Sequence, residues 1–230
     1  MRVKPAIDEI YHIFNRGVEK REIFLDDLDR ERFMRGLYVF NDTYPFINGN
    51  RKSNVREVGL LSKDREKLVE ILAFVLMPNH YHLMVKQIAE NGITEFIRKL
   101  GTGYTNYFNL RYKRVGPLFQ GKYKCALIKD DKYFMYLPHY IHLNPIGINL
   151  PKMRQANVKN LNQTVSFLES YRWSSYPYYI GKNNFFEIID NKLLKEVFET
   201  PQQYKNNIIQ WLKDGNIEDL DDIALEKKAE

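Results

Sequence analysis

The sequence predicts an α+β fold, a ferredoxin-like antiparallel sheet with helices on one face, followed by a C-terminal helical extension. The elements follow one another as strand, helix, strand, strand, helix, strand, helix, which begins as the split β-α-β arrangement. Two apolar runs, residues 69–77 and 80–86, are separated only by Pro78-Asn79. Both residues of this dipeptide favour turns, so we expect the two runs to form an antiparallel hairpin.

The first strand and the first helix precede this hairpin. Residues 10–15 (IYHIFN) are typical of a strand. Asp26 or Asp27 can cap a helix that runs to about Phe40, because apolar residues recur there near helical spacing. Residues 41–64 are polar and rich in Asn, Lys, Arg and Gly, which predicts a long loop or excursion.

The remaining elements of the sheet domain follow the hairpin. Apolar residues recur every three or four positions over residues 93–112, so they share one face of a helix. Residues 119–128 can form another strand. Asp130 or Asp131 then caps a helix that must end before Pro145. Beyond residue 155 we expect two short helices, around 191–198 and 202–213.

The composition is that of a folded protein without a membrane segment. The chain has 230 residues, of which 44% are hydrophobic and 14% aromatic. No apolar run reaches the length of a membrane span, and the N-terminal residues lack the apolar core of a signal peptide. The single cysteine, Cys125, excludes an internal disulfide and fits a reducing cytosol.

Basic residues are concentrated in one interval of the chain. The net charge is +6, but residues 216–230 carry a balance of −4, so residues 1–215 carry +10. No acidic residue lies between Glu95 and Asp130, an interval with eight basic and seven aromatic residues. Cations neutralise phosphates and aromatic rings stack on unpaired bases, which favours a nucleic-acid surface. The alternative is a solvated basic face over a core built from those aromatic rings.

The histidine pair His80 and His82 opens the second strand of the hairpin. Side chains of a strand alternate between its faces, so the two imidazoles point the same way while Tyr81 points to the opposite face. Two imidazoles on one face can hold one metal ion. The alternative is a pair of solvated or hydrogen-bonded strand histidines.

Tyr140 and Asn144 form the second candidate pair. Residues four apart share one face of a helix, so a phenol and a carboxamide would project together. An amide oxygen suits Mg²⁺ or Mn²⁺, and a tyrosine can act as a covalent nucleophile on phosphorus. The alternative is a packed tyrosine at an ordinary helix end. Pro138 lies two residues before Tyr140, so the helix either begins near Pro138 or bends there.

These motifs together resemble one family, the single-tyrosine HUH transposases of the insertion-sequence type, and among them most closely the REP-associated tyrosine transposases. The similarity covers roughly residues 8–182. It is carried by the runs YHIFNRG (11–17), MPNHYH (77–82), GPLFQGKYK (116–124), YIHLNP (140–145) and WSSY (173–176).

The resemblance implies two domains and a role for each motif residue. Residues 1–154 would form the catalytic domain, and residues 155–230 a C-terminal helical extension with an acidic tail. His80, His82 and Asn144 match the ligands of a Mg²⁺ or Mn²⁺ ion, and Tyr140 matches the nucleophile. The implied activity is nicking and rejoining of single-stranded DNA through a 5′-phosphotyrosine intermediate.

The resemblance also implies partners and a location. The partner would be single-stranded DNA with a hairpin, the protein a monomer or homodimer, and the location the cytoplasm of a bacterium or archaeon, close to the nucleoid. Candidate DNA contacts, for which ordinary surface cations are the alternative, are Arg16, Arg98, Lys99, Arg111, Lys113, Arg114, Lys122 and Lys124.

Three other interpretations compete with this one. A DNA-binding protein on the same fold would not cut, but binding alone requires none of the four motif residues. A zinc hydrolase would need a carboxylate or third histidine at suitable spacing. A replication initiator or relaxase uses the same chemistry with accessory regions that a chain of 230 residues lacks. Of the other polar residues we expect Tyr104 and Tyr107 to pack or stack on bases, His139 and His142 to be structural, and His12 to lie at the edge of the site.

Overall fold

The computed structural model describes the fold in six segments. These are residues 4–44, 65–148, 161–182, 188–190, 192–198 and 200–214. Most of the polar excursion predicted at 41–64, the predicted domain boundary between residues 154 and 155, and the acidic tail lie outside the described residues.

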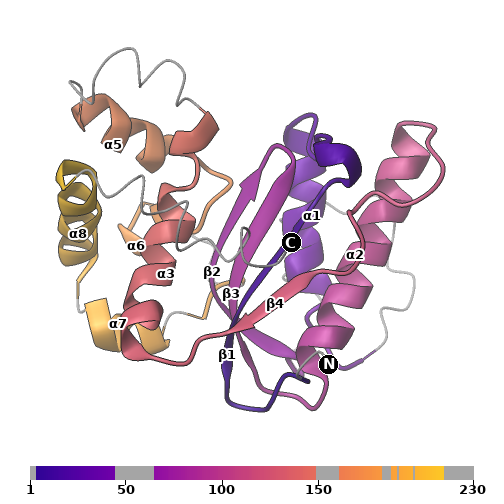
Figure 1. Cartoon of the computed structure of the whole chain (residues 1–230), viewed down its shortest axis with the longest axis horizontal. Helices are drawn as coiled ribbons and strands as arrows, with labels where there is room; N and C mark the ends of the chain where they lie inside the picture. The colour runs from indigo at the N-terminus through magenta and orange to yellow at the C-terminus, as the bar shows by residue number, and fades with distance from the viewer. Residues whose placement is uncertain are drawn as a thin grey trace.

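Four antiparallel strands form the sheet, which is built from β1 (Ile10–Arg16), β2 (Val69–Met77), β3 (His80–Gln87) and β4 (Lys124–Leu127). Their spatial order is β2-β3-β1-β4, so β1 and β3 lie in the centre (Figure 1). This order confirms the predicted fold class. β4 is much shorter than the predicted strand at 119–128, because Gly121, with a φ of +70°, turns the chain just before it.

Two helices cover one face of the sheet, as expected. They are α1 (Asp27–Val39), capped by Asp26, and α2 (Gly92–Arg111). Between them and the sheet lies an aromatic cluster in which Phe33 contacts both Tyr81 and Tyr104, with ring centroids 5.0 Å apart in each pair. Tyr81 therefore points to this face, and the side chains before and after it in β3 point to the opposite one.

The opposite face is covered by α3 (Asp131–Leu143), which contacts β2 and β3 (Figure 1). Asp130 caps α3 by accepting a hydrogen bond of 2.7 Å from the backbone N–H of Tyr133. The helix therefore begins well before Pro138, which lies inside it, and it ends before Pro145 as predicted. Of the two alternatives for Pro138, a helix start at the proline is wrong.

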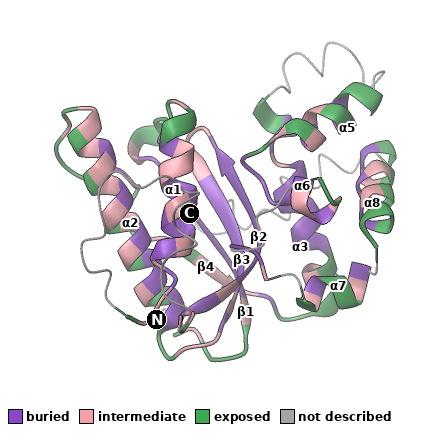
Figure 2. Ribbon diagram, turned by 180° about the vertical axis from the view of Figure 1, so that it is seen from behind, coloured by how far each residue is buried: buried purple, intermediate pink, exposed green. Residues whose placement is uncertain are grey.

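Among its described residues, the C-terminal part has the helices α5 (Leu161–Ser170), α6 (Tyr176–Tyr179), α7 (Lys192–Phe198) and α8 (Pro201–Lys213). The last two confirm the predicted short helices, whereas α5 and α6 were not predicted. Figure 2 shows the largely buried strands β1, β2 and β3 between α1 and α2 on one side and α3 with the C-terminal helices on the other.

The chain between α5 and α6 covers the outer edge of the sheet. The N–H of Leu76 donates to the carbonyl of Trp173 at 2.8 Å, and the N–H of Ser175 donates to the carbonyl of Phe74 at 3.0 Å. An isolated antiparallel bridge joins Val75 and Ser174 between them. Backbone groups of β2 that would otherwise offer a template for another strand are thus paired within the chain.

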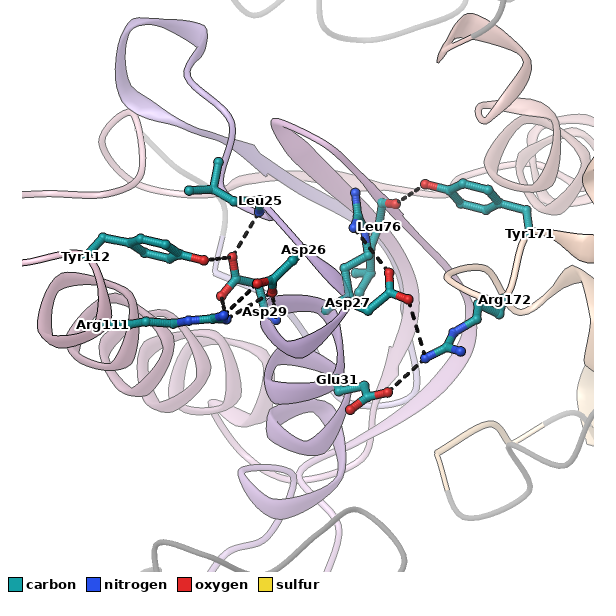
Figure 3. A network of polar contacts seen from close by, with 11 residues as sticks. Leu25, Asp26, Asp27, Asp29, Glu31, Leu76, Arg111, Tyr112, Tyr171 and Arg172 are labelled. Atoms are coloured by element: carbon teal, nitrogen blue, oxygen red, sulfur yellow. Dashed lines mark hydrogen bonds and ion pairs between the residues drawn. The ribbon is translucent and has the colours of Figure 1, made fainter.

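A buried carboxylate ties α1 to the end of α2 (Figure 3). The side chain of Asp29 is fully buried and accepts hydrogen bonds from Tyr107, Tyr112 and Arg111, the last at 2.7 Å. Arg111 also pairs with both carboxylate oxygens of Asp26. Because Asp29 cannot reach water, its charge depends on these partners.

We expect Arg111→Ala to lower the free energy of unfolding by about 3 kcal/mol, because it leaves Asp29 buried with a reduced set of donors. Urea denaturation measures the change. The control is Lys113→Ala, two residues along at an exposed position, which should change stability by less than about 0.5 kcal/mol. Equal stability of the two variants would contradict the structural role of Arg111.

Candidate active site

The strand register places two histidines beneath α3. In the pairing of β1 with β3, His80 lies opposite Arg16 and His82 lies opposite Phe14. The two imidazole centroids are 5.1 Å apart with perpendicular planes, and both rings are on the face opposite Tyr81. The predicted common orientation of His80 and His82 is therefore present in the structure.

His12, expected only at the edge of the site, belongs to this cluster. It lies on β1 on the same face, and its Nε2 is 2.9 Å from Nδ1 of His82. The other ring nitrogen, Nδ1, is 3.3 Å from the hydroxyl of Tyr133 on α3. Strand alternation puts His12 on the same face as Phe14, which lies opposite His82. The sequence alone does not show that these two strands are neighbours, so it could not place His12 in the cluster.

Tyr140 reaches the cluster from α3. Its ring centroid lies 5.4 Å from that of His82 and 6.0 Å from that of His12, in both cases with nearly perpendicular planes. Only 7% of the residue is exposed, so it lies under the surface against the imidazoles. The sequence-based expectation that a phenol from a distant helix lies beside the strand histidines agrees with this geometry.

Asn144 follows one turn later, as the C-cap of α3, with its backbone N–H donating to the carbonyl of Tyr140 at 3.1 Å. Its side-chain Oδ1 is 3.5 Å from Nε2 of His80. The four residues singled out in the sequence, from β3 and from α3, are thus brought together in one place.

Burial keeps the imidazoles neutral. Desolvation lowers the pKa of His12 to about 3 and that of His80 to about 4, and it lowers the pKa of His82 well below its usual value. A neutral imidazole has a lone pair on one nitrogen, which is the form that binds a metal. Two such nitrogens and an amide oxygen are a donor set that fits a divalent cation.

The donors beside the histidine pair differ from those of a zinc hydrolase. Among the described residues, no group of three or more His, Cys, Asp or Glu side chains has a geometry that could hold a metal ion. The third donor beside His80 and His82 would be the neutral amide of Asn144. A zinc hydrolase wants a further imidazole or carboxylate and a general base.

The candidate DNA contacts separate into three groups. Arg16 and Lys124 lie on the sheet face that carries the histidines, because Arg16 is paired with His80 and Lys124 with Phe14, which is paired with His82. Three others are bonded within the fold: Lys99 to Glu95 and the carbonyl of Asp42, Arg111 to Asp26 and Asp29, and Arg114 to Asn109. The exposed remainder is Arg98, Lys113 and Lys122.

Arg16, opposite His80 at the end of β1, is held in position by hydrogen bonds. Its Nε donates to Oε1 of Gln120 at 2.6 Å, and the backbone N–H of Gln120 donates to the carbonyl of Arg16 at 2.8 Å. The loop before β4 therefore fixes the guanidinium beside His80, and this proximity contributes to the lowered pKa of that histidine.

The remaining two histidines are structural, as expected. His142 bonds to the hydroxyl of Tyr204 on α8 and to Oγ of Ser175, each at 2.6 Å. His139 lies parallel to the rings of Tyr204 and Trp211, with centroids 5.2 and 5.6 Å away. Both attach the helix that carries Tyr140 to the C-terminal helices.

We expect acid to destabilise the protein through its buried histidines. Burial lowers the pKa of His139 to about 4, so between pH 6.5 and about 4 the unfolded chain binds a proton that the folded chain does not. The free energy of unfolding therefore falls as the pH decreases through this window, by up to about 3 kcal/mol for this one group.

Urea denaturation at pH 7.5 and 4.5 measures this dependence. In His139→Phe, which keeps an aromatic ring against Tyr204, the decrease should be smaller than in the wild type. A stability that is the same at both pH values in the wild type would contradict the expectation.

The fold and the histidine–tyrosine cluster agree with the resemblance seen in the sequence. A ferredoxin-like sheet carries His80 and His82, and Tyr140 on a separate helix lies beside them. These are the residues on which the resemblance to HUH transposases was based in the sequence. Residues 35–144 match the family model described as "Transposase IS200 like". This match over residues 35–144 confirms the resemblance to IS200-like transposases inferred from the motifs.

A structural comparison agrees on the fold. Five chains of solved structures match, among them one described as "Structure of the REP associates tyrosine transposase bound to a REP hairpin". That match has a TM-score of 0.51 and 12% sequence identity, and it covers 79% of this chain and 85% of the other. A search of curated proteins gave no match. In the part of the chain that is described, no helix has the length and apolar character to cross a membrane.

Proposed function

We propose that this protein nicks and rejoins single-stranded DNA with Tyr140 as the nucleophile and with His80, His82 and Asn144 as ligands of Mg²⁺ or Mn²⁺. The observation that carries the proposal is the contact between the Tyr140 ring and the His82 ring, which come from different layers of the fold. The ring of a third histidine, His12, lies 6.0 Å from that of Tyr140, and Oδ1 of Asn144 lies 3.5 Å from Nε2 of His80.

The proposed reaction exchanges one phosphodiester for another. The Tyr140 oxygen attacks the phosphorus, loses its proton and forms a bond to it, while the bond from phosphorus to the 3′ oxygen breaks and that oxygen takes up a proton. The strand is left with a 5′-phosphotyrosine and a free 3′-hydroxyl, which can reverse the step onto another strand. A bound divalent cation would polarise the phosphoryl oxygens.

The surroundings of the site support a phosphate-bearing substrate. Arg16 and Lys124 are two cations on the histidine face, so they would contact the phosphates that flank the reacting one. For the strand beyond the site, a hairpin is the proposed form of the DNA, since the REP-associated transposase named above is described as bound to one. We also predict that three exposed cations bind this DNA, namely Arg98, Lys113 and Lys122.

A covalent capture experiment tests the proposal. The protein is incubated with single-stranded oligonucleotides that contain the inverted repeats flanking its gene and are labelled at the 3′ end, because the fragment 3′ of the cut stays attached to the tyrosine. Mn²⁺ or a chelator is added, and the products are resolved on a denaturing gel. The expected result is a labelled protein band with the single strand and Mn²⁺, and none with the chelator or with blunt duplex of the same sequence.

The competing function is a protein that binds DNA on the same fold and does not cut. It predicts retarded bands on a native gel and no labelled protein on a denaturing gel under any metal condition.

Three further predictions accompany the proposal. They are a domain boundary between residues 154 and 155, a monomer or homodimer, and a cytoplasmic location near the nucleoid.

A further inference from the structure

We propose that Asn79 and His12 are positioning residues that select the nitrogen by which each histidine of the pair binds the cation. Asn79 would fix His80 and His12 would fix His82, so that both present Nε2 to one point. This inference rests on the proposed metal site but concerns hydrogen positions in the metal-free protein, and it can therefore be tested separately.

Asn79 is oriented by the backbone. Its amide nitrogen Nδ2 donates to the carbonyl of Lys20 at 3.2 Å, which leaves Oδ1 directed at Nδ1 of His80, 2.6 Å away. An amide oxygen can only accept a hydrogen bond, so Nδ1 of His80 must carry the ring hydrogen. In the neutral ring the lone pair is then on Nε2.

The contact at Nε2 is much longer than the 2.6 Å contact at Nδ1, so it does not decide the tautomer. This nitrogen lies 3.5 Å from Oδ1 of Asn144, so two acceptors face each other without a hydrogen between them. A cation next to both would convert this unfavourable contact into a shared site. If the Asn144 amide were rotated instead, its Nδ2 would donate to Nε2, which again requires the lone pair there.

His12 constrains His82 by the same logic. Nδ1 of His82 and Nε2 of His12 are 2.9 Å apart, so one of them donates and the other accepts. If Nδ1 of His82 accepted, its ring hydrogen would be on Nε2 and neither nitrogen could bind a cation. A ligating His82 therefore donates from Nδ1 to His12, which in turn donates from its own Nδ1 to the hydroxyl oxygen of Tyr133. Such outer hydrogen bonds commonly fix the ligands of metal sites.

Long-range proton–nitrogen NMR of ¹⁵N-histidine protein without metal tests the inference. In the wild type at neutral pH, His80 and His82 should each show the protonated type of nitrogen at Nδ1 and the unprotonated type at Nε2. A ring hydrogen on Nε2 of either residue would overturn the inference, and this measurement needs no variant.

The second test measures the affinity of variants for Mn²⁺ by isothermal titration. Asn79→Ala should weaken Mn²⁺ binding about tenfold and shift His80 toward a mixture of tautomers, while Asn79→Asp, which keeps the accepting oxygen, should restore the wild-type tautomer. His12→Phe keeps a ring beside His82 but removes the acceptor, and should weaken binding similarly.

Asn106→Ala, at an exposed position on α2, is the matched control and should bind like the wild type. Wild-type affinity and tautomers in both Asn79→Ala and His12→Phe would contradict the inference. A wild type that shows the expected tautomers but binds no Mn²⁺ would instead contradict the proposed metal site.

Discussion

Tyr140→Phe is expected to abolish the covalent adduct between the protein and a labelled single strand, a loss of at least about 1,000-fold, while DNA binding remains within about twofold of the wild type. The substitution removes only the attacking oxygen. The phenylalanine ring keeps the edge contact with His82, for which the centroid separation is 5.4 Å. Denaturing gels measure the adduct, and native gels measure binding.

The matched control is Tyr136→Phe, one turn earlier on α3. Its ring stacks on that of Tyr140 with centroids 6.0 Å apart, so it removes a hydroxyl from the same helix and the same aromatic stack. Adduct formation in this variant should equal that of the wild type. If Tyr140→Phe still forms the adduct, or if Tyr136→Phe loses it, the nucleophile has been assigned wrongly.

His80→Ala is expected to remove nearly all cleavage and to weaken Mn²⁺ binding by more than about 100-fold, beyond the usual effect of an outer-shell change. The remaining donors would be one imidazole and one amide oxygen, too few to hold a divalent ion firmly. Cleavage in this variant should no longer respond to added Mn²⁺. Isothermal titration and cleavage assays over a series of Mn²⁺ concentrations measure the two effects.

The control for His80→Ala is His139→Phe. It also removes a buried histidine, but one whose ring stacks on Trp211 away from the candidate ligands. This variant should keep the response to Mn²⁺ at neutral pH. Cleavage like that of the wild type in His80→Ala, or in the wild type with a chelator, would contradict the metal dependence.

The parts of the fold set by local signals could be predicted from the sequence. The Pro78-Asn79 turn defines the hairpin of β2 and β3, and the alternation of a strand then puts His80 and His82 on one face. Asp130 or Asp131 was expected as a cap because either side chain could reach the N–H groups of the next turn, and in the structure Asp130 accepts from Tyr133. The i, i+4 spacing likewise brings Asn144 to the side of Tyr140.

Contacts between distant segments could not be predicted. The approach of His12 to His82 depends on the register between β1 and β3, which no local pattern specifies. The pairing of residues 173–175 with the edge of β2 has the same origin. Arg111 was grouped with the DNA contacts because its interval lacks acids, yet its partners Asp26 and Asp29 lie far upstream.

Anomalous scattering from a crystal of the protein soaked in Mn²⁺ tests the proposed metal site most directly. We expect one strong peak about 2.2 Å from a ring nitrogen of His80, a ring nitrogen of His82 and the amide oxygen of Asn144, with the Tyr140 hydroxyl directed toward the same space. A peak held by other residues, or none near the two imidazoles at saturating Mn²⁺, would contradict it.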